Sequence, residues 1–138
     1  MHRIKPPESS PCPCGSQKPY EECCAPYHAG KVAPTADALM RSRYSAYTMP
    51  LEPYLQATWH AGTRPPTLDL SADKDTRWLG LDIRRHEATG ADTAIVEFVA
   101  RYKIGGRAHR LHEVSRFVRE NGRWYYLDGE FPAKTDRV

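Results

Sequence analysis

The sequence has no long hydrophobic run, and it has no cysteine after Cys24. No stretch approaches the roughly 20 apolar residues that a membrane-spanning helix needs, and no signal-peptide hydrophobic core follows Met1. Together with clustered thiols, which persist in reducing compartments, these absences predict a cytoplasmic protein without a membrane partner.

Several motifs that identify enzyme classes are also missing. The sequence contains no phosphate-binding glycine loop, no nucleophile elbow and no metalloprotease motif. It has neither an internal repeat nor a long low-complexity run. The net charge of +3 is too small to indicate a nucleic-acid partner directly. The 138 residues, 40% hydrophobic and 27% charged, suffice for one globular domain and a small appendage.

All the cysteines lie within one short stretch, at Cys12, Cys14, Cys23 and Cys24. A disulfide framework would spread its cysteines through the chain, and a reactive thiol needs only one, or a Cys-x-x-Cys pair. Four thiolates in a short loop are typical of a tetrahedral soft-metal site. Two alternatives remain open. In one, His28 replaces one sulfur as a metal ligand. In the other, no metal binds, and the cysteines are reduced or form one or two adventitious disulfides.

Two helices are predicted in the first half of the chain. Thr35 is a suitable N-cap, and Met40, Tyr44 and Tyr47 recur at helical spacing, which predicts an amphipathic helix over 36–48. Pro53 opens a second short helix with Leu55 and Trp59 on one face. The remaining segments are predicted as a loose arm over 1–11, a metal loop over 12–28, a linker over 29–34 and a loop over 63–75. The predicted division is an N-terminal part, 1–30, and a larger domain, 31–138.

From Arg77 onward the hydrophobic period changes to two, which predicts strands. The predicted strands cover 77–88, 93–104, 107–120 and 123–129. A turn at 89–92 and the dipeptides Gly105-Gly106 and Asn121-Gly122 separate them, and both dipeptides are two-residue hairpin signals. A curved four-stranded antiparallel meander wrapped around two helices is an α+β cone.

The hairpin turns also predict which residues face one another. The first turn places Glu113 opposite Phe98, and the second places Ser115 opposite Asp128. One face of the sheet would then carry apolar residues together with Glu113, Ser115, Tyr126 and Asp128. Carboxylates on an apolar concave face cost free energy unless they are paired.

Arg41 and Arg43 on the first predicted helix are candidate partners for these carboxylates. One interpretation is a polar pocket in which Glu113 and Asp128 bind a ligand or act as acid–base groups. The other is a buried Glu–Arg pair that only fixes the helix against the sheet. Structural ion pairs perturb carboxylates as readily as catalysis does, which favours the second interpretation.

The cysteine pattern, Cys12-Pro13-Cys14 followed eight residues later by Cys23-Cys24, resembles a SEC-C motif. This zinc module is named for the C-terminus of the SecA preprotein translocase. The resemblance implies one zinc ion per chain. It implies the following ligands: Cys12, Cys14, Cys23 and Cys24.

Further segments resemble the YchJ-like family of bacterial SEC-C proteins. These segments are 39–44, 58–60, 78–81, 98–102, 115–117 and 120–129. The resemblance implies a fold similar to nuclear transport factor 2 (NTF2), whose relatives include pocketed enzymes and non-enzymatic binders, but it implies no activity. Many family members carry a second SEC-C motif at the C-terminus. None precedes Val138, so a function that requires two zinc modules is not expected here.

Two classes of function follow. In the first, the protein is a non-enzymatic zinc-binding interaction protein whose SEC-C module contacts a protein or ribonucleoprotein partner, because SEC-C modules of the translocase family contact a chaperone and ribosomes. Four sulfurs leave no metal-bound water to activate, and the loop would display Lys18, Tyr20, Tyr27 and His28. In the alternative, the cone is a small-molecule binder or an enzyme. Its candidate pocket residues are Arg41, Arg43, Glu113, Ser115, Tyr126 and Asp128.

Overall fold

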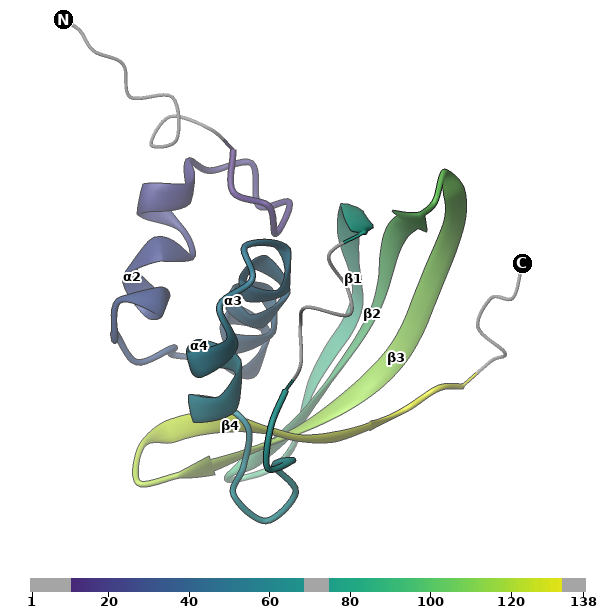
Figure 1. Cartoon of the computed structure of the whole chain (residues 1–138). Coiled ribbons are helices and arrows are strands. Elements are labelled where there is room, and N and C mark those ends of the chain that lie inside the picture. Colours follow the sequence, from purple (N-terminus) through teal and green to yellow (C-terminus); the bar gives the residue numbers. More distant parts are fainter. Residues whose placement is uncertain (1–10, 69–74, 133–138) are drawn as a thin grey trace, which may run out of the picture.

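A curved antiparallel sheet lies against one side of two helices (Figure 1). The computed structural model describes residues 11–68 and 75–132. The predicted N-terminal arm, apart from Pro11, and residues 69–74 of the predicted loop therefore lie outside the described residues. None of the described helices is both long and apolar enough to cross a membrane.

The described residues form four helices, of which the last two were predicted, from a capping residue and from a proline, while the first two lie in the stretch predicted as the metal loop. They are the 3₁₀ helix η1 (Tyr20–Glu22), α2 (Ala25–His28), α3 (Ala36–Thr48) and α4 (Glu52–Ala57). Thr35 caps α3, because its extended backbone leaves the side chain free to accept a hydrogen bond from the Ala38 N–H at 3.3 Å. The predicted range of this helix is confirmed, and Pro53 lies in the first turn of α4 as predicted.

The prediction that Trp59 lies on the same helical face as Leu55 is wrong. Helix α4 ends at Ala57, and Trp59 forms an isolated bridge with Tyr126 of the sheet. The chain leaves the helix to pair with this strand: the Tyr126 N–H donates to the Thr58 carbonyl at 2.8 Å, and the His60 N–H donates to the Tyr126 carbonyl at 2.8 Å.

The predicted four-stranded meander is confirmed, with the strands in the spatial order β1-β2-β3-β4. The strands are β1 (Thr76–Gly90), β2 (Thr93–Ile104), β3 (Arg107–Glu120) and β4 (Arg123–Glu130). Both residues of the Gly105-Gly106 turn have positive φ, 58° and 80°, and so do Asn121 and Gly122, at 53° and 79°. Such turns match the right-handed twist of the flanking strands, which explains why these dipeptides identify the hairpins.

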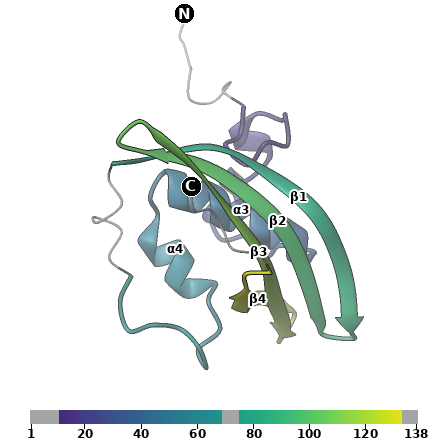
Figure 2. The same ribbon diagram turned by 90° about the vertical axis from the view of Figure 1, so that its right-hand side faces the viewer.

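Irregular pairing bends the sheet. The β1–β2 register shifts at three places, and the β3–β4 register shifts between Arg116 and Phe117. An extra residue on one strand increases local twist and bends the strand. Viewed from the side, the long strands curve around the helices (Figure 2).

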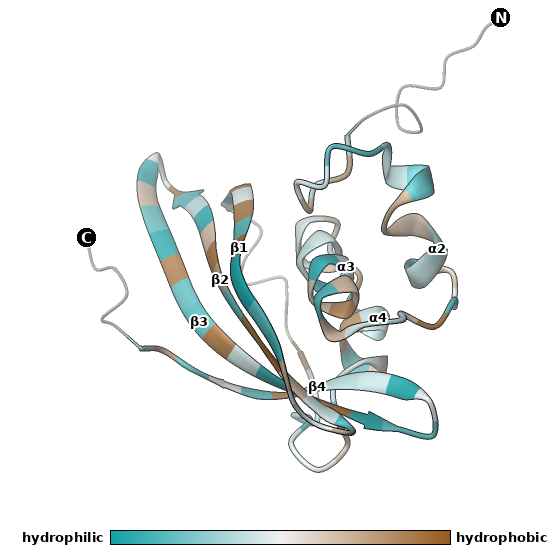
Figure 3. Ribbon diagram, turned by 180° about the vertical axis from the view of Figure 1, so that it is seen from behind, coloured by the Kyte–Doolittle hydropathy of each residue, from teal (hydrophilic) through white to brown (hydrophobic). Residues whose placement is uncertain are grey.

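The core fills the concave side of the sheet. Leu39, Met40 and Tyr44 of α3 pack with apolar residues of the strands, and bands of hydrophobic and hydrophilic residues alternate along β3 (Figure 3). The same cluster includes three cysteines, Cys12, Cys14 and Cys24, each at most 3% exposed. The N-terminal loop and the cone therefore share one hydrophobic core.

Candidate metal centre and cone cavity

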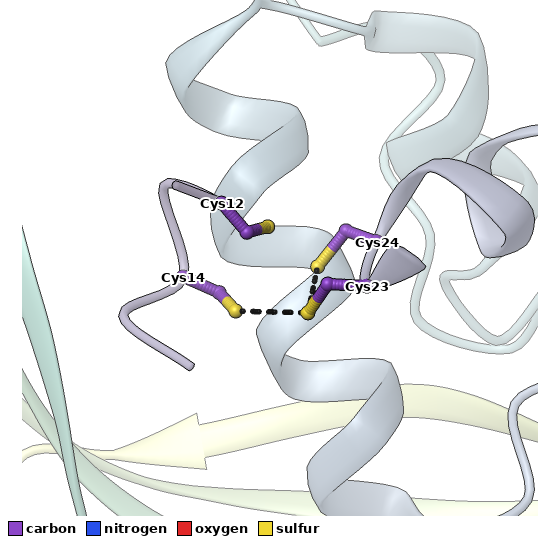
Figure 4. A group of neighbouring side chains, drawn as sticks. All are labelled: Cys12, Cys14, Cys23 and Cys24. Carbon is purple, nitrogen blue, oxygen red and sulfur yellow. Dashed lines mark hydrogen bonds between the residues drawn. The ribbon is translucent and has the colours of Figure 1, made fainter. Parts of the chain in front are cut away.

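Residues 12–24, here called the cysteine loop, fold into a tight reversal. The Cys12 N–H donates to the Lys18 carbonyl at 2.8 Å, and the Gly15 N–H donates to the Cys12 carbonyl at 3.1 Å. Gly15 has φ +84°, a left-handed conformation that glycine adopts without strain. Helix η1 then leads the chain back to Cys23, so that the two cysteine pairs face each other (Figure 4).

The four sulfurs lie close enough together to hold one metal ion. All lie within 4.8 Å of one another. The Cys14 and Cys23 sulfurs are 3.5 Å apart, and those of Cys23 and Cys24 are 3.9 Å apart. A tetrahedron with metal–sulfur bonds of about 2.3 Å has edges of about 3.8 Å. The cysteines are free thiols, and the cluster can hold one metal ion.

The electrostatics of the cluster also favour a cation. Hydrogen bonding to sulfur, chiefly from Cys12, lowers the pKa of Cys14, whereas the hydrogen bond with Cys12 is the main cause that raises the pKa of Cys24. Burial raises the pKa of Cys23. Thiols this close share protons, because several adjacent thiolates would repel one another. A bound cation would remove that repulsion.

Polar groups around the sulfurs complete the site. The Ser16 hydroxyl lies 3.0 Å from the Cys23 sulfur, and the Ser45 hydroxyl donates to the Cys24 sulfur at 3.4 Å. Arg41 donates to the Cys14 carbonyl at 2.9 Å. The prediction that Arg41 faces the sheet carboxylates is therefore wrong, because its guanidinium turns to the cysteine loop. Ser45 was not predicted, since only the fold brings α3 to the loop.

Both ring nitrogens of His28 form hydrogen bonds within the protein. Its Nε2 donates to the Ser42 carbonyl at 2.8 Å, and its Nδ1 then accepts from the Tyr20 hydroxyl at 2.7 Å. Burial lowers the pKa of His28, which keeps the ring neutral. With both ring nitrogens engaged, His28 is unsuited to replace a sulfur, and the geometry supports a ligand set of four cysteines.

A cavity of about 250 Å³, here called the cone cavity, lies between α3 and the sheet. Twelve residues line it: Met40, Arg43, Tyr44, Tyr47, Trp59, Trp78, Phe98, Ala100, Leu111, Glu113, Ser115 and Tyr126. Four of the six predicted pocket residues are among them. The other two, Arg41 and Asp128, are not.

Glu113 supplies the negative charge of the cavity and is 8% exposed. Its Oε2 accepts hydrogen bonds from the Ser115 hydroxyl at 2.9 Å and from the Tyr126 hydroxyl at 3.0 Å. Burial, followed by the charge of Glu113, raises the pKa of Tyr126. Tyr126 therefore stays protonated and acts as a donor.

Arg43 supplies the positive charge and is 3% exposed. It donates to the Leu55 carbonyl at 2.9 Å and to the Thr58 hydroxyl at 2.7 Å. The guanidinium carbon lies 4.7 Å from the ring centroid of Tyr126 and 5.2 Å from that of Trp59. Among the ion pairs of the described residues, none joins Arg43 to Glu113, so the direct Glu–Arg pair considered for this face is not formed.

Asp128 lies on the opposite face of the sheet. The shift between Arg116 and Phe117 pairs Arg116 with Asp128, and Ser115 with Gly129. The predicted pairing of Ser115 with Asp128 is therefore wrong, because a bulge moves every later side chain of β4 to the other face. Arg116 binds both Asp128 oxygens at 2.6 Å and lowers the pKa of that carboxyl.

Two parts of the chain match known families. Residues 9–26 match the SEC-C motif, and residues 35–129 match the family described as YchJ, middle NTF2-like domain. A UPF0225 protein of Xanthomonas campestris pv. campestris is 57% identical over 121 residues, which cover 87% of this chain and 94% of that protein. The chain belongs to the UPF0225 family.

Other similar proteins agree with this assignment. The UPF0225 protein of Cupriavidus metallidurans is 57% identical over 128 residues, covering 88% of this chain and 89% of that protein. The solution structure of a SEC-C motif containing protein from Rhodopseudomonas palustris has a TM-score of 0.79 and 32% identity, and covers 90% of this chain and 100% of that one. The crystal structure of a SEC-C motif containing protein from Psychrobacter arcticus has a TM-score of 0.70 and 32% identity, and the match covers 96% of this chain and 83% of that one. The UPF0225 chain thus combines a SEC-C motif with an NTF2-like domain.

Proposed function

We propose that the cysteine loop of this UPF0225 protein binds one zinc ion through four sulfurs and presents a surface to a protein or ribosome-associated partner. The observation that carries the proposal is the sulfur cluster, whose separations of 3.5 Å and 3.9 Å suit tetrahedral zinc. Four sulfurs complete the coordination shell and leave no position for a reacting water. The zinc is therefore structural, and the role is non-enzymatic.

The outer side of the cysteine loop offers polar groups to a partner. Lys18, Glu21 and Glu22 are exposed. Tyr20 and His28, which were expected to be displayed, are only partly exposed and contact each other. The exposed outer edge of the loop therefore forms one part of the partner surface.

An adjoining groove of about 510 Å³, here called the interaction groove, extends this surface onto the cone. Tyr54, Trp124 and Tyr125 give it aromatic walls, while Lys31 and Arg123 add positive charge. Aromatic and arginine side chains are enriched in protein interfaces. A segment with apolar and acidic side chains would suit this lining. Tyr27 and His28 also line the groove, and both belong to α2, which begins immediately after the cysteine loop. Zinc bound by the loop would therefore fix one wall of the groove.

The test combines elemental analysis with affinity capture by the tagged full chain. We expect about one zinc per wild-type chain and a partner that is retained from lysate with and without ribonuclease. Cys23→Ser removes the most accessible ligand, and we expect it to lose both zinc and partner. The double variant Lys31→Glu/Arg123→Glu should keep zinc and lose the partner.

The matched control is Arg77→Glu/Arg110→Glu, which reverses the charge of two exposed residues, one on β1 and one on β3. Neither residue lines the interaction groove. It should keep both zinc and partner. Loss of the partner only after ribonuclease treatment would indicate an RNA-dependent, ribonucleoprotein contact. A wild-type chain without zinc would refute the metal proposal, and a partner that still binds the zinc-free, folded Cys23→Ser chain would refute the interaction proposal.

A further inference from the structure

The outer face of the sheet, which is the side away from α3 (Figure 2), carries a group of exposed cations. Four residues make up this group, here called the cationic patch: Arg77 of β1, Arg101 and Lys103 of β2, and Arg110 of β3. Side chains alternate between the two faces of a strand. Trp78, Ala100 and Leu111 line the cone cavity, and each is the sequence neighbour of one of the arginines. The arginines therefore point outward, and so does the lysine, which is two residues from Arg101.

The strand register places like charges of the patch directly opposite each other. Arg77 pairs with Lys103 across β1 and β2, and Arg101 pairs with Arg110 across β2 and β3. The two pairs are neighbours on one face, because Arg101 and Lys103 are two residues apart on β2. Like charges in such positions destabilise a sheet. The stability of the fold therefore does not explain why these residues are present.

No acid among the described residues forms an ion pair with the patch. Elsewhere on the same face, charges are paired. Glu97 binds Arg85 at 3.1 Å and His112 at 2.7 Å. Arg116 binds Asp128 at 2.6 Å. The unpaired positive charge of this face is thus concentrated in the patch, although the net charge of the whole chain is only +3.

Protection of a sheet edge does not account for the patch either. Charged side chains on an edge strand prevent it from pairing with other chains. In the spatial order β1-β2-β3-β4, only β1 and β4 are edge strands. Arg101, Lys103 and Arg110 lie on the inner strands β2 and β3. An anionic partner lying across the patch would remove the repulsion between these cations.

The composition and spacing of the patch favour phosphate groups as the anions. Three of the four cations are arginines, whose planar guanidinium groups can bind two phosphate oxygens at once. The two like-charge pairs are separated by two residues of an extended strand, or about 7 Å. Successive phosphates of a nucleic-acid strand have a similar and regular spacing, so one strand can place a phosphate against each pair.

The patch offers no ring on which a base could stack. Trp78 and Tyr102, the aromatic residues beside it in sequence, contact each other on the cavity side of the sheet. Contacts to phosphate position a nucleic acid but do not read its sequence, and stacking platforms or base-edge contacts are needed for more.

We infer that the cationic patch binds the phosphodiester backbone of a nucleic-acid strand without reading its sequence. The patch shares no residue with the cysteine loop, the interaction groove or the cone cavity, and the inference does not depend on the function proposed for the loop and groove. Ribonuclease in the capture experiment removes whatever RNA the patch retains. A failure of the proposed protein partner is therefore distinguishable from a failure of the patch.

The test measures fluorescence anisotropy of labelled oligouridylate RNA and oligothymidylate DNA with the zinc-loaded full chain. We expect both oligomers to bind at low salt, because they share the phosphate backbone. The logarithm of the affinity should fall linearly with the logarithm of the salt concentration. Contacts from the four cations predict a slope of about −3, since each phosphate contact with a single strand contributes about −0.7.

Arg101→Gln/Arg110→Gln removes one like-charge pair from the patch. We expect the slope to fall to about −1.4 and the affinity at low salt to fall at least about tenfold. The melting temperature checks that the variant folds, which we expect because the two charges repel each other in the wild type.

The matched control is Arg85→Gln/Arg116→Gln, which removes two exposed arginines that are paired with acids on the same face. It changes the net charge by the same amount, and it should keep the wild-type slope and affinity. Equal losses in the two double variants would overturn the inference, because binding would then follow net charge alone.

The wild-type salt dependence needs no variant. The absence of binding to both oligomers at low salt would overturn the inference. So would binding to phosphatidylserine vesicles or to polyglutamate in place of the oligomers, since the patch would then serve a membrane surface or an acidic protein.

Discussion

Ser16 is the side chain whose loss should weaken the metal site while leaving all four sulfurs. Its hydroxyl lies 3.0 Å from the Cys23 sulfur. Removing such an outer partner of a metal ligand typically costs about 10–100-fold in metal affinity. We expect Ser16→Ala to bind one zinc with an affinity lowered by this factor, measured by competition with a chelating dye.

The control for Ser16→Ala is Glu21→Ala, which changes an exposed neighbour without a sulfur contact. Its zinc affinity should equal that of the wild type. An unchanged affinity of Ser16→Ala would contradict a role for the hydroxyl at the metal site.

The grouping of the four cysteines was predictable, but their surroundings were not. A short loop brings Cys12 and Cys23 together, and the close spacing of the cysteines in the sequence predicts this. From α3, Ser45 reaches the Cys24 sulfur and Arg41 reaches the Cys14 carbonyl, and no local pattern links either residue to the loop. Arg41 was assigned to the sheet because helical periodicity fixes the spacing of side chains but not the direction in which a long one turns.

Among the secondary-structure elements, the strands were predictable near their turns and less so away from them. The Asn121-Gly122 turn fixes Phe117 opposite Tyr126, as predicted. A bulge just beyond that pair moves Asp128 to the outer face of the sheet, and no residue type in the sequence of β4 predicts a bulge there. The polar end of the cavity therefore keeps Glu113 but loses Asp128. Trp59 was misplaced for a similar reason, since pairing with Tyr126 outcompeted one more helical turn.

Acid should weaken the attachment of α2 to α3. Burial lowers the pKa of His28 below its ordinary 6.5. Below about pH 6.5 the unfolded chain therefore binds a proton that the folded chain resists. The stability contributed by the neutral ring is complete above that pH and is lost as pH falls toward the lowered folded pKa.

Urea unfolding of the wild type and of His28→Gln at pH 8.0 and pH 5.5 measures this effect. We expect the wild type to lose more stability on acidification than His28→Gln. Acid-driven release of metal affects both chains, so the difference between them reports on His28. An identical loss in the two chains would show that His28 does not contribute.

For the molecule as a whole, the shared core predicts that metal and cone stability rise and fall together. A ligand at 1,000 times its dissociation constant stabilises a fold by about 4 kcal/mol. For a chain of this size, its removal should lower the melting temperature by about 10 °C or more. We expect chelation to lower the transition followed by near-ultraviolet circular dichroism of Trp59, Trp78 and Trp124.

Cys23→Ser is the reference for this experiment, because it should melt at the lower temperature and gain no further shift from the chelator. A tryptophan transition that chelation leaves unmoved in the wild type would show that the cysteine loop and the cone are energetically independent.

The contacts from α3 to the cysteine loop also bear on how such a motif spreads between proteins. Residues 9–26 carry all four cysteines, but the hydroxyl of Ser45 and the guanidinium of Arg41 belong to the host domain. A gene fragment that encodes only the motif would transfer the ligands and leave these outer contacts behind. Each recipient protein would have to evolve its own supporting helix, and the strength of metal binding would then be inherited from the recipient rather than from the motif.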